Sequence, residues 1–152
     1  MDNTQKLQKM FWQLNLYFQA HFCPIVSEDV LLYCENNCIQ PFYKTINDYL
    51  KRQGLTKRQL SSRLQDRKSI YNIYHQDNYI PTKRLAICIG LCLKLSKEDF
   101  SDYLHAVGYH LSCHIRQDVV VMFCLENGIY EGVEVDLCLE KMQEKPLFNC
   151  YF

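Results

Sequence analysis

The sequence predicts an all-helical protein, and two patterns support that prediction. Apolar residues recur at three- and four-residue steps along most of the chain, which is the spacing of one face of an α-helix. Ser or Thr stands just before several of these periodic segments, where a side-chain oxygen can cap the first turn of a helix. The 152 residues are 48% hydrophobic and 22% charged, so the chain can form a core and does not have a disordered composition.

Caps, glycines and prolines divide the chain into its expected helices. The segment 83–95 is apolar on nearly every side, so we expect it to be the central core helix. The full set comprises residues 4–21, a short helix capped by Ser27, a helix from Pro41 to Gly54, residues 57–64 capped by Thr56, residues 67–76, residues 83–95 capped by Thr82, a helix from Ser96 to Gly108, and a helix capped by Ser112 that ends at Asn127.

The last periodic segment fits two structures. Val133, Val135 and Leu137 alternate with polar residues as in a strand, whereas Val135, Cys138 and Met142 fit the spacing of a helix. A single strand would have no partner in an otherwise helical chain, so the segment is predicted to be a helix.

Charge divides the chain into three parts, although the formal net charge is zero. Residues 1–40, an N-terminal helical extension, carry −2, and residues 96–152, an acidic C-terminal helical module, carry −6. Residues 41–95 carry eleven basic against three acidic residues, a balance of +8. We expect the three parts to pack as one globular unit. The basic part is a candidate surface for a polyanion.

Nine cysteines and no recognisable export signal predict a cytoplasmic protein with free thiols. Cys34 and Cys38, like Cys88 and Cys92, lie four residues apart, but that spacing is also typical of one apolar helix face. No apolar run is long enough to span a membrane. We therefore expect no metal ion, no cofactor and no membrane contact.

Residues 42–95 contain a recognisable arrangement of helices and turns. The residues that carry it are Gly54, Leu55 and Thr56 before one helix, Leu60 and Leu64 within it, Ile70 and Ile73 in the next, and Pro81, Thr82 and Lys83 before the apolar helix. This segment resembles the lambda-repressor-like helix-turn-helix family. Its turn departs from the family pattern: a Gly and an apolar residue are usual, whereas Gln65 and Asp66 stand here, one residue short.

Further pieces extend the resemblance through residue 147. The stretches 66–68, 79–84, 106–109 and 126–130 look like an all-helical module of bacterial proteins with mostly unassigned roles that carry the same helix-turn-helix core. The resemblance implies a lambda-repressor-like core with N-terminal and C-terminal helical extensions. It also implies a transcriptional regulator that recognises specific double-stranded DNA in the major groove through helix 67–76.

The basic part holds residue types suited to DNA contacts. Arg67 can pair with guanine, Asn72 with adenine, and Tyr71 can contact a thymine methyl group or a phosphate. Helix N-termini favour phosphate, and Thr56, Lys57 and Lys83 stand at the starts of predicted helices. The predicted DNA-binding residues are Thr56, Lys57, Arg67, Lys68, Ser69, Tyr71, Asn72 and Lys83. Because such proteins commonly bind two half-sites, we also expect a homodimer.

A different class of function stays open at this point. The same scaffold could be a helical adaptor or inhibitor from a phage or other mobile element that holds a protein partner through its N-terminal or acidic C-terminal helices. Enzymatic function is not expected, because the chain has no glycine-rich phosphate loop, no G-x-S-x-G and no H-E-x-x-H motif.

Overall fold

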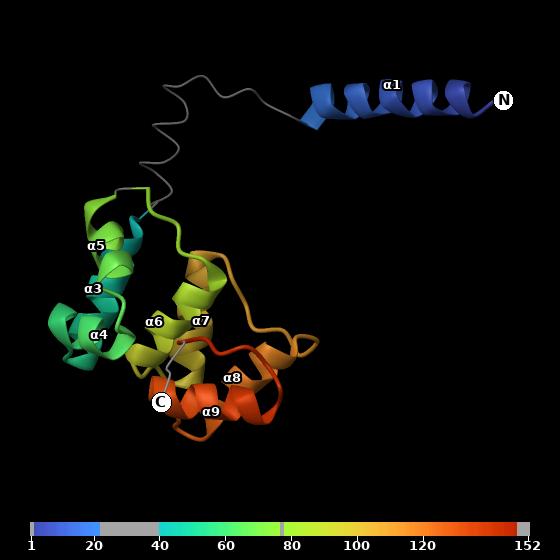
Figure 1. The fold of residues 1–152 in the computed structure, drawn as a ribbon. Helices are drawn as coiled ribbons and strands as arrows, with labels where there is room; N and C mark the ends of the chain where they lie inside the picture. Colours follow the sequence, from blue (N-terminus) through green and yellow to red (C-terminus); the bar gives the residue numbers. More distant parts are fainter. Residues whose placement is uncertain (1, 22–39, 77, 149–152) are drawn as a thin grey trace. The chain divides into compact units, whose positions relative to one another are not determined.

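The computed structural model describes residues 2–21, 40–76 and 78–148, and every regular element in these ranges is an α-helix (Figure 1). The eight helices are α1 (Asn3–His21), α3 (Phe42–Gln53), α4 (Lys57–Leu64), α5 (Arg67–His75), α6 (Lys83–Cys92), α7 (Lys97–Val107), α8 (Arg116–Glu126) and α9 (Gly132–Lys141). The all-helical prediction is confirmed for these residues. The expected short helix capped by Ser27 lies outside them.

The chain divides into two compact units, residues 1–39 and residues 40–152. In the first unit, α1 forms where the apolar spacing predicts a helix, and Asp2 Oδ1 accepts a hydrogen bond from the Gln5 amide at 2.8 Å. No residue of α1 is buried. Its large apolar side chains, among them Met10, Phe11 and Trp12, are 44–63% exposed.

A glycine ends α3, and side-chain caps begin α4 and α5. Gly54 ends α3 in the left-handed conformation that glycine adopts without strain. Thr56 and Gln59 form a reciprocal capping box at the start of α4. Asp66 caps α5 by accepting a hydrogen bond from the Ser69 amide at 3.0 Å. Only Gln65 and Asp66 separate α4 from α5, so the connection is as short as the sequence suggests.

Helix α6 is the centre of the second unit, as predicted. Every residue from Leu85 to Cys92 is buried, and α6 packs against α4, α7 and α9 (Figure 1). The close packing of α6 on α7 depends on Gly90, because an added Cβ would lie 2.6 Å from a ring carbon of Phe100. The hydrophobic core therefore brings helices of the basic part and of the acidic part into one unit.

In the acidic part, the predicted Ser112 cap is wrong, and the predicted helix in the last segment is confirmed. Ser112 does not cap α8: its Oγ accepts a hydrogen bond from the His114 amide at 3.2 Å, and the helix begins later, at Arg116. The physical reason is Asp118, whose Oδ2 accepts from the Ser112 amide at 2.9 Å and holds the chain in a turn before the helix. The ambiguous last segment is helix α9, as predicted.

Two buried interactions hold the residues that follow α9. Asp136 on α9 accepts hydrogen bonds from the backbone amides of Leu147 (2.8 Å) and Phe148 (3.1 Å). The Leu147 side chain is completely buried in the core. The Asp136 carboxylate and the buried Leu147 side chain thus hold the segment after α9 against the helices. Among the described residues, no helix is both long and apolar enough to cross a membrane.

The turn between α4 and α5 generates a stability prediction. Gln65 has φ 55°, a left-handed conformation that costs a residue with a Cβ about 1–2 kcal/mol. Gln65→Gly removes this strain but increases the entropy of the unfolded chain, so we expect a net gain of about 0.5–1 kcal/mol in the free energy of unfolding. Urea denaturation measures it.

Gln76→Gly is the matched control for this prediction. Gln76 is exposed and has φ −121°, an ordinary conformation for any residue, so its substitution should lower the free energy of unfolding by about 0.5–1 kcal/mol. Equal losses in the two variants would contradict the strained turn.

Candidate nucleic-acid interface

Helices α4 and α5 border an open groove of about 680 Å³. The groove is lined by Lys57, Arg58, Ser61, Ser62, Arg67 and Ile70. Three of these six side chains are cations, and they come from both helices. We call these residues, together with Lys68 and Tyr71 on the outer side of α5, the α4–α5 surface.

The cations of the α4–α5 surface are not neutralised by nearby carboxylates. Lys57, Arg58, Arg67 and Lys68 are all exposed. Each of the four ion pairs found among the described residues involves another cation, namely Lys83, Lys94, Lys97 or Arg116. Asp66, beside Arg67, is occupied with capping α5. The α4–α5 surface therefore presents a concentrated positive charge to solvent.

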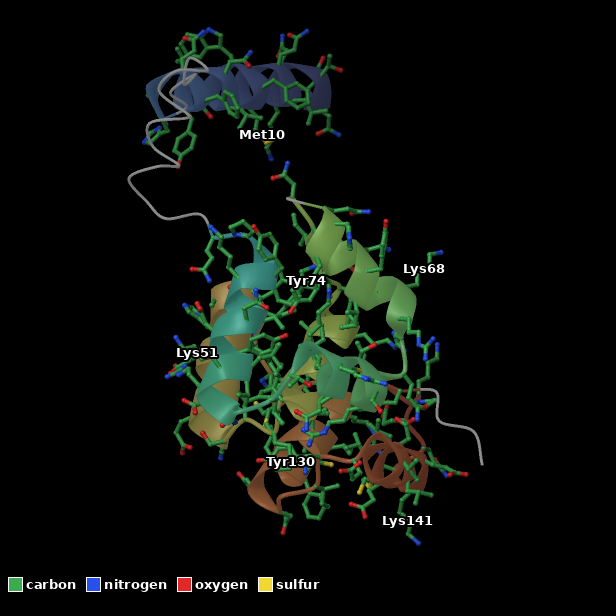
Figure 2. The ribbon with its side chains drawn as sticks, turned by 90° about the vertical axis from the view of Figure 1, so that its left-hand side faces the viewer. Met10, Lys51, Lys68, Tyr74, Tyr130 and Lys141 are labelled. Carbon is green, nitrogen blue, oxygen red and sulfur yellow. The ribbon has the colours of Figure 1, made fainter. Side chains whose placement is uncertain are left out.

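The outer face of α5 ends in a rigid aromatic pair. Tyr71 is 60% exposed, and its ring stacks on that of His75 with centroids 3.9 Å apart and planes 14° from parallel. His75 Nδ1 donates a hydrogen bond to the Tyr71 carbonyl at 2.8 Å. Arg67 and Lys68 begin the same helix, so cations and a flat aromatic ring share one nine-residue element. Figure 2 labels Lys68 on this helix.

Tyr74 ties α4 and α5 to α3. Its hydroxyl donates to Asn47 Oδ1 at 2.7 Å, and the Lys57 ammonium lies 3.9 Å from the centre of its ring (Figure 2). Burial raises the pKa of Tyr74, so the phenol remains a donor at neutral pH. Lys57 is thereby held in a cation–π contact while its ammonium stays exposed at the groove.

The sequence-predicted residues divide into two groups. Lys57, Arg67, Lys68 and Tyr71 lie together on the α4–α5 surface, with Asn72 half-buried further along α5. The other three mainly make structural contacts. Thr56 is the cap of α4, and the Ser69 hydroxyl donates to Asp66 Oδ2 at 2.6 Å.

Lys83 is the third of these structural residues. Its ammonium lies 2.6 Å from Oδ2 of Asp118, whose side chain is 2% exposed. This ion pair joins the first turn of α6 to α8. Sequence reasoning missed Arg58, Ser61 and Ser62 as groove residues. The dense positive charge around Lys57 and Arg58 could have indicated Arg58. The sequence does not reveal which α4 side chains face α5, because that depends on how the two helices pack.

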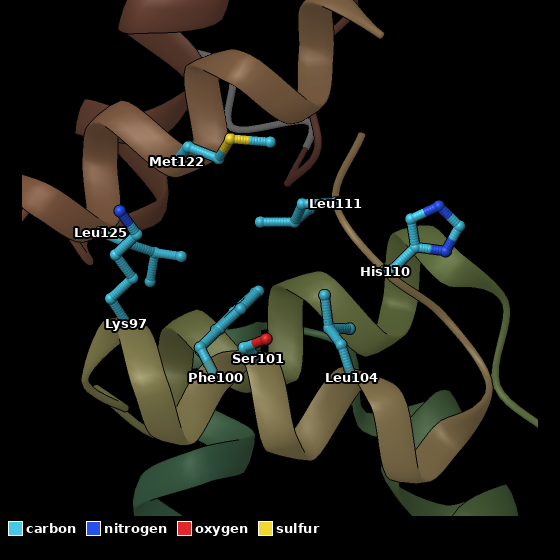
Figure 3. A pocket seen from close by; sticks show the side chains of 8 residues that line it. All are labelled: Lys97, Phe100, Ser101, Leu104, His110, Leu111, Met122 and Leu125. Atoms are coloured by element: carbon cyan, nitrogen blue, oxygen red, sulfur yellow. The ribbon is translucent and has the colours of Figure 1, made fainter. Parts of the chain in front are cut away.

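A second pocket, of about 210 Å³, lies between α7 and α8 (Figure 3). It is lined mostly by apolar side chains such as Phe100, Leu104 and Leu125. Its one cation, Lys97, is paired with Glu126 at 2.6 Å. Besides Lys97, its polar lining is Ser101 and His110, so most of its contact with a ligand would be apolar.

The described residues contain no cluster suited to a metal ion, and the Cys124 thiol is buried. No group of three or more His, Cys, Asp or Glu residues among them is arranged to hold a metal ion. Burial raises the pKa of the Cys124 thiol to about 12, and the neighbouring Cys138 adds to the shift. Cys124 is therefore a protonated core residue at neutral pH rather than a nucleophile.

No family model, curated protein or solved structure matches this chain.

The ion pair of Lys83 leads to a prediction that separates structural from surface lysines. Lys83→Ala leaves the buried Asp118 carboxylate with only the Ser112 amide as donor, and we expect it to lower the free energy of unfolding by about 1–3 kcal/mol. Urea denaturation measures the loss. Lys68→Ala, on an exposed lysine that forms no ion pair with the described residues, is the control and should change stability by no more than about 0.5 kcal/mol.

Proposed function

We propose that this protein is a sequence-specific DNA-binding transcriptional regulator of the helix-turn-helix type, and that the α4–α5 surface contacts double-stranded DNA. The observation that carries the proposal is the group of four exposed cations on two adjacent helices, none of them in an ion pair within the described residues. A duplex presents closely spaced phosphates, so such a group gains affinity by releasing condensed counterions.

The order of the helices suits this mode of binding. In helix-turn-helix proteins, the first helix crosses the DNA backbone, and the N-terminal residues of the second reach base edges in the major groove. Helix α4 is the first of the pair here, and Arg67 and Lys68 open α5, the second. An α-helix with its side chains is about 10–12 Å across, which fits the roughly 12 Å width of the major groove.

The proposed division of labour follows from the geometry. Arg67, exposed at the groove and at the start of α5, reads a base, and guanine offers it two acceptors. Lys57 and Arg58 on α4 bind phosphates. The cation–π contact with Tyr74 already restricts the Lys57 side chain before DNA binds. Lys57 therefore loses less conformational entropy when it binds a phosphate. Lys83 is not part of this set.

A second candidate function is a protein-interaction adaptor, and the exposed apolar side chains of α1 favour it. Met10, Phe11 and Trp12 are each more than half exposed, which is unusual for so many large apolar residues on one helix. The two candidates make different predictions for variants of the α4–α5 surface.

The first test of DNA binding concerns the proposed base-reading residue. The full chain is used to select a preferred duplex from a randomised library, and affinities for it and for single-base variants are measured by fluorescence anisotropy. We expect Arg67→Ala to cost about 1–3 kcal/mol of binding free energy on the preferred duplex and to relax specificity at one base pair. Lys145→Ala, an exposed lysine of the acidic part, is the matched control and should leave both unchanged.

The second test concerns phosphate contacts. Lys57→Ala should weaken binding to all duplexes alike and lower the slope of log affinity against log salt concentration by about one. Loss of the Tyr74 contact should cost only about 0.5–1 kcal/mol of folding stability. If no duplex is preferred, or if Arg67→Ala, Lys68→Ala and Asn72→Ala are all without effect on a preferred one, the adaptor replaces the DNA-binding proposal.

A further inference from the structure

Helices α8 and α9 border an open apolar groove of about 690 Å³ in the second unit of the chain. Its lining is Val119, Val120, Phe123, Leu137, Cys138, Lys141 and Met142. Lys141 is the only charged residue among the seven. This groove takes no part in the proposed contact with DNA, because none of its residues belongs to the α4–α5 surface.

Exposed apolar side chains accompany the groove on both helices. Arg116, at the start of α8, donates to the carbonyl of Met142, just past the end of α9, at 3.0 Å, so the helices run antiparallel. Several large apolar side chains on the two helices are exposed, and those on α8 recur every four residues. They are Ile115, Val119 and Phe123 along α8, and Val133, Leu137 and Met142 along α9, each 41–51% exposed. Exposed apolar side chains gathered at an open groove are typical of an interaction site.

Two opposite charges stand along the same face of α9. Glu134 and Lys141 are seven residues apart, which puts them on nearly the same side of the helix and about 10 Å apart along its axis. That separation is too large for the two to pair with each other. Both are exposed, and neither forms an ion pair within the described residues. Leu137 and Cys138 lie between them.

We propose that the α8–α9 groove is a homodimer interface, in which α9 of one protomer packs antiparallel against α9 of a second copy of this chain. In a two-fold interface, if residue i contacts residue j of the partner, j also contacts i. An antiparallel pairing centred between Leu137 and Cys138 places Lys141 opposite Glu134 of the partner subunit, and the reciprocal pair forms by symmetry. The apolar side chains of both copies fill the centre between these two ion pairs.

A second copy fits this groove better than other occupants do. Nucleic acid is disfavoured by the apolar lining and by the −6 balance of residues 96–152. An amphiphilic anion would pair with Lys141 but leave Glu134 beside its apolar tail. A second α9 supplies one acid and one base at the required spacing, because it has the same sequence. This charge complementarity is between Glu134 and Lys141 of two copies of the same surface, and it does not depend on the proposed DNA contact.

Charge reversal tests the pairing directly. Sedimentation velocity on the full chain, over about 5–200 μM, measures the dimer dissociation constant, and we expect the wild type to dimerise in this range. Lys141→Glu and Glu134→Lys each place two like-charge contacts in the interface, so each should weaken dimerisation at least about tenfold. The double variant restores opposite charges and should return the constant to within about threefold of the wild type. Circular dichroism checks that all variants are helical.

Two further variants control this experiment. Lys51→Glu makes the same charge change on an exposed lysine of α3 and should leave the dissociation constant unchanged. Phe123→Gln removes an apolar contact at a half-exposed position and should weaken the dimer without lowering folding stability. A wild type that is monomeric throughout overturns the proposal. The proposal is also overturned if neither single charge reversal changes the dissociation constant, which is the result expected of association through α1. It is likewise overturned if the double variant remains monomeric. DNA is absent from every arm, so these outcomes leave the proposed function to its own tests.

Discussion

The packing of Tyr103 on α6 is the contact on which the second unit depends. Tyr103 is completely buried, and its hydroxyl donates to the carbonyl of Ala86 at 2.8 Å, so the one polar atom of the side chain is satisfied inside the core. Its ring meets Tyr49 of α3 edge-on at 5.6 Å between centroids. Gly90 allows this approach, since any side chain there would collide with Phe100. One aromatic residue thus fixes the positions of α3, α6 and α7 together.

The position of α4 follows from the end of α6. Arg63 on α4 donates to the carbonyl of Cys92 at 3.0 Å, and Gln53 on α3 donates to the carbonyl of Leu93 at 3.2 Å. These side chains satisfy carbonyls that the end of a helix leaves without intrahelical partners. Because α6 is buried, the helices that hold its C-terminal end are anchored to the core. The α4–α5 surface therefore rests on the best-packed element of the fold.

Local patterns were sufficient to predict most helices, because caps such as Thr56 and the three- and four-residue apolar spacing act over a single turn. Prediction failed where a distant residue decided the outcome. Asp118 holds the Ser112 amide, so the expected cap became part of a turn. Asp118 also binds Lys83, 35 residues away, a contact that the local pattern around Lys83 does not reveal. Within the site, Lys57 and Arg67, both singled out from the sequence, line one groove, and their contact with DNA stays a prediction. Arg58 was not singled out, since only the packing of α4 on α5 brings it to the groove.

The two-residue connection between α4 and α5 has a consequence for how this surface can change. Gln65, in a left-handed conformation, ends α4 through the hydrogen bond from its amide to the Ser61 carbonyl, and the next residue, Asp66, caps α5, so no flexible residue separates the two helices. The pair is preorganised, so association with a matching partner loses little conformational entropy. Such rigidity also limits adaptation, because the angle between the helices cannot adjust to a differently shaped partner. New preferences at this surface would therefore arise through exchange of exposed side chains, with the backbone left as it is.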